Sequence, residues 1–210
     1  MVEKARPVSI FLVDDDAAVR RGVSALLTAA DYSVTCFNSA ETFLDELQNC
    51  DLSNAALLVD VCMPGMQGIE LLSHLKSEGT ELPVVVMTAH GDIPLAVRAM
   101  QSGAAYFLEK PFTAEEVTAA LTRATKEIGS ASNHDLSALP EVKARFDALT
   151  PREKEVIQEL VEGATSKEIA RRFDISPRTV EAHRKNLIAK MQAGSFAELI
   201  RMAVALGLCE

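Results

Sequence analysis

The chain has 210 residues, 48% of them hydrophobic and 24% charged, a composition of folded globular proteins that argues against extended disorder. No apolar run approaches the roughly 20 residues of a membrane span, and no apolar core of a secretion signal follows Met1. We therefore expect a cytoplasmic protein with no membrane partner. The cysteines show neither metal-site nor disulfide spacing and are expected to be reduced thiols: Cys36, Cys50, Cys62 and Cys209.

Charge is distributed unevenly along the chain, which suggests two parts with different tasks. Residues 1–125 hold 8 basic and 17 acidic residues, whereas residues 165–201 hold 8 basic and 4 acidic ones. The net charge of −9 therefore conceals a locally basic segment near the C-terminus. The length fits one ordinary domain and a smaller second one.

The first part alternates short β-rich runs with helical patterns. The predicted strands are 9–13, 33–37, 55–59, 83–87 and 105–108. The predicted helices between and after them are 17–30, 39–48, 68–77, 93–102 and 113–127. This alternation predicts an α/β fold with a five-stranded parallel sheet that is covered by helices on both faces.

A linker and a small helical domain are predicted to follow. Residues 128–146 include a stretch rich in Gly, Ser, Ala and Asn and are predicted to be the linker. Beyond it, four helix-start signals predict a small all-α domain of four helices over 147–210. Three are capping boxes and one is a Ser-Pro pair; they begin at Thr150, Thr165, Ser176 and Ser195.

Polar residues that could carry chemistry follow four of the five predicted strands. They are Asp14, Asp15, Asp60, Thr88 and Lys110. Because ligand sites in such sheets lie beyond the carboxyl ends of the strands, we expect these side chains to converge. Carboxylates suit Mg²⁺, and an Asp can act as a nucleophile toward phosphorus, so the set favours phosphoryl chemistry on a carboxylate. Asp16, in contrast, is expected to cap the helix that starts at residue 17.

Four motifs surround these positions: DDD after the first strand, LLVDVCMPGMQGIELL around Asp60, then MTAHGD and FLEKPF. Together they resemble the receiver domain of two-component response regulators over residues 8–127. The resemblance implies a flavodoxin-like (βα)5 fold in which Asp60 accepts a phosphoryl group from a sensor histidine kinase. It implies Mg²⁺ bound directly by Asp15, Asp60 and the backbone carbonyl of Cys62, and through water by Asp14.

The resemblance also assigns roles to residues after the fourth and fifth strands. Thr88 and Lys110 would contact the phosphoryl oxygens. Phe107, three residues before the lysine, would be the aromatic switch residue that turns inward when Thr88 moves. The bond between Lys110 and Pro111 is expected to be cis, as is usual in such domains.

In the second part, the segment TSKEIARRFDISPRTVEAHRKNLIAKM predicts a helix, a turn and a second helix that could enter a DNA major groove. On the second helix, Val180, Leu187 and Met191 form one apolar face. The other faces and the preceding helix are expected to bind DNA, with Arg184 and Lys167 on phosphates and several others at base edges. The candidate contacts are Arg178, Thr179, Glu181, Ala182, Arg184, Lys185 and Lys167.

The segment from LTPREKEV to NLIAKM resembles the LuxR-type helix-turn-helix domain, and HGDIPLAVRAM and DISPRTVEAHR resemble the FixJ subgroup of response regulators. The resemblance implies a transcription regulator that dimerises on phosphorylation and binds an inverted-repeat promoter site. RNA polymerase is a further candidate partner. Apart from phosphorylation and dephosphorylation of its own aspartate, no enzymatic activity is expected.

Two other interpretations remain open from the residues. A Mg²⁺-dependent phosphohydrolase of the haloacid-dehalogenase type also has an acidic motif after its first strand. It needs an acidic pair after its lysine, where this chain offers only Glu115 and Glu116 at a helix start. A DNA-binding protein with a vestigial receiver is the second alternative, and the full set of five polar residues argues against it.

Overall fold

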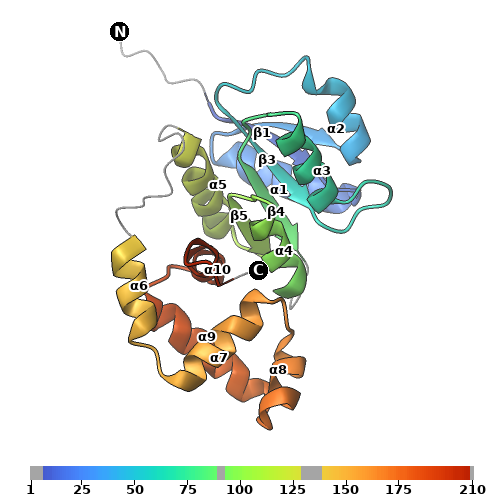
Figure 1. The fold of residues 1–210 in the computed structure, drawn as a ribbon. Coiled ribbons are helices and arrows are strands. Elements are labelled where there is room, and N and C mark those ends of the chain that lie inside the picture. Colours follow the sequence, from blue (N-terminus) through green and yellow to red (C-terminus); the bar gives the residue numbers. More distant parts are fainter. Residues whose placement is uncertain (1–6, 89–92, 129–138, 209–210) are drawn as a thin grey trace. The chain divides into compact units, whose positions relative to one another are not determined.

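The computed structural model describes residues 7–88, 93–128 and 139–208 (Figure 1). Cys209 and residues 129–138 of the predicted linker lie outside these ranges. By Cα proximity, residues 1–90 and 102–131 form one compact unit, and residues 91–101 and 132–210 form a second. Helix α4 (Ile93–Gln101) therefore groups with the C-terminal helices. Among the residues described, no helix is long and apolar enough to cross a membrane.

The first unit contains one parallel sheet of five strands in the order β2-β1-β3-β4-β5 (Figure 1). The strands are β1 (Ser9–Val13), β2 (Ser33–Phe37), β3 (Ala55–Asp60), β4 (Val84–Thr88) and β5 (Tyr106–Glu109). Every residue of β3 and β4 is buried, as expected for central strands covered on both faces. The predicted strands are confirmed, with ends shifted by at most one residue.

Helices cover both faces of this sheet. They are α1 (Ala17–Ala29), α2 (Ala40–Leu47), α3 (Gly68–Ser77) and α5 (Ala114–Ile128). Right-handed crossovers place α1 and α5, which pack against each other, on one face and α2 and α3 on the other. The predicted α/β fold is therefore confirmed, and the carboxyl ends of all strands lie along one edge.

The described residues of the second unit form helices joined by short loops, with no strand among them. Besides α4, its helices are α6 (Leu139–Asp147), α7 (Pro151–Val161), α8 (Ser166–Phe173), α9 (Pro177–Met191) and α10 (Phe196–Ala205). The predicted N-caps form at the four expected residues, each of which accepts a backbone N–H in the first helical turn. The predicted apolar face of α9 is also correct, since Val180, Leu187 and Met191 are fully buried.

The four helices predicted over 147–210 are present as α7–α10, and a further helix that was not predicted, α6, lies mostly within the segment predicted as the linker. Pro140 stands near the start of α6, where a proline is compatible with a helix. Arg145 in its last turn donates a hydrogen bond to the Met191 carbonyl at the end of α9 (3.3 Å). No described residue of α6 is buried, so the segment lacks the apolar period that would reveal a helix.

Glu153 on α7 links the start of that helix to the end of α9. Its carboxylate accepts the Thr150 N–H (3.0 Å) and pairs with the Lys190 ammonium (2.7 Å). The residue is 6% exposed, whereas the Lys190 side chain is 48% exposed. The hydrogen bond from Lys190, with those from Thr150, lowers the pKa of Glu153 from 4.5 to about 2. Glu153, which the sequence predicts only as part of a helix cap, therefore also joins α7 to α9.

Replacing Glu153 by Gln should destabilise the second unit because it removes the ion pair and weakens the cap. We expect the free energy of unfolding at neutral pH to fall by about 1 kcal/mol or more, measured by urea titration with circular dichroism. Glu155→Gln is the matched control, since that side chain is 53% exposed on the same helix. It should change stability by less than about 0.5 kcal/mol.

The pH dependence gives a second measurement on Glu153→Gln. A carboxyl group with a lowered pKa stabilises the fold above its unfolded pKa, and the stabilisation is lost as the pH falls through the folded pKa. The stability difference between wild type and Glu153→Gln should therefore be full above about pH 5 and shrink as the pH falls toward about 2. A constant difference over this range would contradict the assignment.

Candidate functional site

The carboxyl edge of the sheet gathers the polar residues predicted from strand ends. Asp14 follows β1, Asp60 ends β3 and Thr88 ends β4, and these three strands are neighbours in the sheet. Among the described residues only four polar or charged ones are buried, and three of them are Asp14, Asp60 and Thr88. Burial of polar groups is costly, so their concentration at one edge indicates a functional site.

Lys110 joins two of these carboxylates. Its ammonium donates to Asp14 Oδ2 at 2.8 Å and to Asp60 Oδ1 at 2.6 Å, and the lysine side chain is 26% exposed. The Lys110 N–H also donates to the Thr88 carbonyl (2.8 Å), which extends the pairing of β4 and β5 to this residue. The cation therefore stands at the point where repulsion between the two carboxylates is greatest.

Burial and pairing act in opposite directions on the protonation of this pair. Burial raises the pKa of Asp60 above its ordinary value, although Lys110 opposes the shift. At Lys110, burial acts to lower the pKa, but the hydrogen bonds to Asp14 and Asp60 outweigh it and raise the pKa. The ammonium therefore stays charged, and the perturbed carboxyl group is of the kind found at functional sites.

Thr88 and Phe107 complete this edge from β4 and β5. The Thr88 hydroxyl is buried and has no hydrogen-bond partner among the described residues, an arrangement that is uncommon for a buried polar atom. Phe107 is 7% exposed and pairs with Val86 in the register of β4 and β5. A buried hydroxyl with open hydrogen-bonding capacity beside a lysine is suited to receive an anionic group.

Of the predictions for the three consecutive acids, the helix cap by Asp16 is confirmed. Asp16 caps α1, since its carboxylate accepts the N–H of Ala18 (2.6 Å) and of Val19 (3.4 Å). Asp14 Oδ1 accepts the Asp16 N–H (2.9 Å), which holds the loop against the sheet, while Asp15 is exposed. Among the described residues no three acidic, histidine or cysteine side chains are already grouped to hold a metal.

The loop after β3 carries the remaining predicted positions. Cys62 is exposed and makes no disulfide, and a backbone hydrogen bond from it acts to lower the pKa of Asp60. The Lys110–Pro111 bond is cis, as the resemblance implied. The oxygen donors near this loop, carboxylates and a backbone carbonyl, are of the type that Mg²⁺ prefers.

Two residues that hold this loop were missed by sequence reasoning. A Cβ on Gly68 would lie 2.3 Å from the Asp60 carbonyl oxygen, so the backbone admits no side chain there. Glu41 on α2 accepts the Met66 N–H (2.8 Å), a bond that lowers the pKa of this glutamate. The Gly in the motif after Asp60 was a visible signal for a close approach, whereas nothing in the sequence indicated Glu41.

The second unit contains the predicted helix-turn-helix. Helix α8 ends at Asp174, which adopts the left-handed conformation (φ 54°) and donates its N–H to the Ala170 carbonyl. Ser176 then caps α9, and Pro177 occupies its first turn. Because α8 and α9 pack against each other through buried residues such as Ile169 and Val180, the outer face of α9 is held at a fixed angle.

Most of the predicted DNA contacts are exposed on α8 and α9. They are Arg178, Thr179, Glu181, Ala182, Lys185 and Lys167. Arg184 differs, since its side chain is 14% exposed, stacks 4.1 Å from the Phe196 ring centre and pairs with Glu181 (3.0 Å). Glu181 also accepts a hydrogen bond from Ser166 (2.6 Å). Arg184 therefore also contributes to packing of the unit, and its phosphate contact stays a prediction.

Comparison with known proteins accounts for both sites. Residues 10–122 match the response regulator receiver domain family. Residues 147–203 match the LuxR family of bacterial regulatory proteins. The chain therefore belongs to the two-component response regulators that join a receiver domain to a LuxR-type DNA-binding domain.

Its relatives place it within this class. It is 44% identical to the transcriptional regulatory protein FixJ of Bradyrhizobium diazoefficiens, over 95% of this chain and 96% of that protein. It is 41% identical to FixJ of Rhizobium meliloti, over 95% of this chain and 96% of that one. The crystal structure of full-length FixJ from B. japonicum matches with a TM-score of 0.54 and 42% identity, covering 97% of this chain and 98% of that chain. The protein is a FixJ-like response regulator, and its regulation of transcription depends on phosphorylation.

The close approach at Gly68 gives a direct test of the geometry. Gly68→Ala should push the end of β3 away and destabilise the first unit by about 1–3 kcal/mol, with slower phosphorylation by acetyl phosphate. Gly22→Ala on α1 is the control, because a Cβ there meets nothing within 4 Å. It should instead raise stability by about 0.5–1 kcal/mol. Equal stability of the two variants in thermal unfolding would contradict the observed geometry.

Proposed function

We propose that Asp60 accepts a phosphoryl group from a histidine of a sensor kinase in a Mg²⁺-dependent step. The observation that carries this proposal is the Lys110 ammonium between Asp14 and Asp60, at a residue whose N–H binds the carbonyl of Thr88, which has a buried hydroxyl without a partner among the described residues. A nucleophilic carboxylate, a cation and a hydroxyl donor are then within one small region at the end of three neighbouring strands. The proposed receiver spans 8–127, residues 128–146 connect the domains, and the DNA-binding domain spans 147–210.

The proposed reaction transfers the phosphoryl group from nitrogen to oxygen. An Asp60 carboxylate oxygen attacks phosphorus, the bond from phosphorus to the histidine nitrogen breaks, and the imidazole leaves and takes up a proton from water. Lys110 favours the ionised form of Asp60 before the transfer and can then donate to an oxygen of the incoming group. The Thr88 hydroxyl can donate to a second phosphoryl oxygen.

The residues that would hold Mg²⁺ offer only oxygen donors, which fits this cation. They are the carboxylates of Asp15 and Asp60, the backbone carbonyl of Cys62 and, through water, the carboxylate of Asp14. When bound, Mg²⁺ neutralises charge that accumulates on the transferred group. The phosphorylation and dephosphorylation of its own Asp60 is the only chemistry that we assign to this chain.

The proposed response passes from Asp60 to DNA. Movement of Thr88 toward the phosphoryl group would vacate space that Phe107 fills, and this shifts the receiver between two states. The second state dimerises and binds an inverted-repeat promoter site in the cytoplasm, where contact with RNA polymerase can follow. On DNA, Arg178, Thr179, Glu181, Ala182 and Lys185 of α9 lie toward base edges, and Lys167 and Arg184 contact phosphate.

The phosphoacceptor is tested by Asp60→Asn with Asp16→Asn as its matched control. Acetyl phosphate with Mg²⁺ should add one phosphoryl group to wild type, seen by intact-protein mass spectrometry. Asp60→Asn should abolish the adduct, because the amide is not a nucleophile toward phosphorus. Asp16→Asn should retain it, since asparagine caps a helix as well as aspartate does.

Other outcomes of the same measurement decide between the alternatives. Labelling of Asp60→Asn at the wild-type level would place the acceptor elsewhere. Continuous release of phosphate from a small phosphoester would favour the phosphohydrolase. If neither protein is labelled but both bind promoter DNA equally, the receiver is vestigial.

Lys185→Ala tests base recognition on α9. DNA sites selected by the phosphorylated protein from a random pool would provide the specific ligand. We expect Lys185→Ala to lose about 1–3 kcal/mol of binding free energy on the specific site and much less on random DNA. If Lys185 instead contacts phosphate, the variant should lose the same binding free energy on specific and on random DNA. The slope of log affinity against log salt concentration should then fall by about one unit. Fluorescence anisotropy at several salt concentrations distinguishes the two roles.

A further inference from the structure

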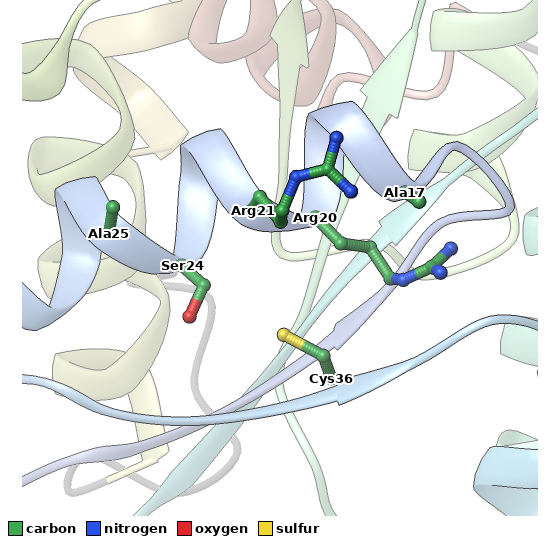
Figure 2. A pocket seen from close by; sticks show the side chains of 6 residues that line it. All are labelled: Ala17, Arg20, Arg21, Ser24, Ala25 and Cys36. Atoms are coloured by element: carbon green, nitrogen blue, oxygen red, sulfur yellow. The ribbon is translucent and has the colours of Figure 1, made fainter.

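Arg20 on α1 holds the loop that carries the acids. Its Nη1 donates to the backbone carbonyl oxygens of Asp14 (2.6 Å) and Asp15 (2.9 Å). Figure 2 shows the Arg20 guanidinium extending along α1 toward the start of the helix, whereas that of the neighbouring Arg21 points in another direction. Arg20 is half-buried and Arg21 is exposed. The two arginines thus have different tasks although they are adjacent in the sequence.

The loop is braced from both sides of its backbone. On the N–H side, the Asp14 carboxylate binds the Asp16 N–H, and the Asp16 carboxylate binds the first amides of α1. On the carbonyl side, Arg20 binds two consecutive peptide oxygens and so fixes the orientation of both peptide groups. Without Arg20, the peptide groups of Asp14 and Asp15 could rotate. The backbone that carries the exposed Asp15 side chain would then no longer be held in one orientation.

The positive charge of Arg20 also lies close to the three consecutive carboxylates. Three consecutive carboxylates repel one another, and a guanidinium on the peptide oxygens lowers the cost of holding them in one short loop. These two bonds of Arg20 end on carbonyls, so Arg20 itself occupies no carboxylate oxygen of Asp14 or Asp15. An arginine that bound the carboxylates directly would compete with a metal instead.

We propose that Arg20 is a positioning residue for the metal site: through the carbonyls of Asp14 and Asp15 it holds both carboxylates ready for Mg²⁺. This inference rests on the proposed function, because it assumes that these acids bind the cation. The residue touches neither the phosphoryl group nor the metal. It therefore affects how tightly the cation binds and leaves the rate of transfer in the loaded protein nearly unchanged.

The test compares Arg20→Met with Arg21→Met in the full chain. Mn²⁺ serves as a paramagnetic probe, and its dissociation constant is measured by electron paramagnetic resonance without any phosphoryl donor. Arg20→Met should raise this constant about tenfold, the scale of losses when groups that orient metal ligands are removed. Arg21→Met should leave it within about twofold of wild type, and Arg20→Lys should give an intermediate value.

A second readout separates binding from chemistry. The Mg²⁺ concentration for half-maximal labelling by acetyl phosphate should rise with Arg20→Met, while the maximal rate at saturating Mg²⁺ stays close to wild type. Acetyl phosphate is used because the reaction then needs no kinase, so a changed kinase contact cannot affect the result. Should Arg20→Met not fold, Arg20→Gln replaces it in both measurements.

Distinct results overturn the inference and the proposed function. Wild-type Mn²⁺ affinity in Arg20→Met or Arg20→Gln, even with an earlier thermal transition, would overturn the positioning role. Equal weakening by Arg20→Met and Arg21→Met would reduce the effect to general charge and overturn it as well. Failure of the wild type to bind Mn²⁺ would instead refute the proposed metal site, and the inference with it.

Discussion

The pairing of one ammonium with two buried carboxylates is the interaction on which the receiver edge depends. Asp14 and Asp60 are 1% and 8% exposed, and two such charges held without a partner would strongly destabilise the fold. Lys110 offsets part of that cost, and it can do so because β1, β3, β4 and β5 stand side by side with all their carboxyl ends at one edge. The order of the strands is therefore what allows the lysine to balance the charge of the two buried carboxylates.

Much of this edge could be predicted, since the positions depend on strand ends. Five β-rich runs predict five parallel strands, and the residues after them must share one edge whatever the side-chain details. The partners chosen at that edge were not predictable. That Lys110 contacts both Asp14 and Asp60, or that Arg20 binds two carbonyls, depends on rotamers and backbone angles that no local pattern encodes. Helix α6 was not predicted for a similar reason. It has no buried residue that would give an apolar pattern, and its contact with α9 joins residues far apart in the sequence.

The DNA-binding unit uses charged side chains for two separate purposes. Glu153 with Lys190, and Arg184 with Glu181 and Phe196, join helices to one another. Lys167, Arg178 and Lys185 remain exposed. A count of basic residues along α9 thus overstates the positive surface offered to DNA, since part of that charge is neutralised within the unit. Recognition by such a surface depends on a few exposed side chains and on the angle at which the buried face holds them.

The long sequence separation within the carboxylate site has a consequence for how the protein is made. Lys110 lies 96 residues beyond Asp14 and 50 beyond Asp60, and β5 is the last strand to leave the ribosome. Contacts of this range form late, because the intervening chain must first give up its freedom. Until β5 docks, a nascent chain has Asp14 and Asp60 without the Lys110 ammonium that pairs with both. The proposed phosphoryl site is therefore complete only when the last strand has joined the sheet.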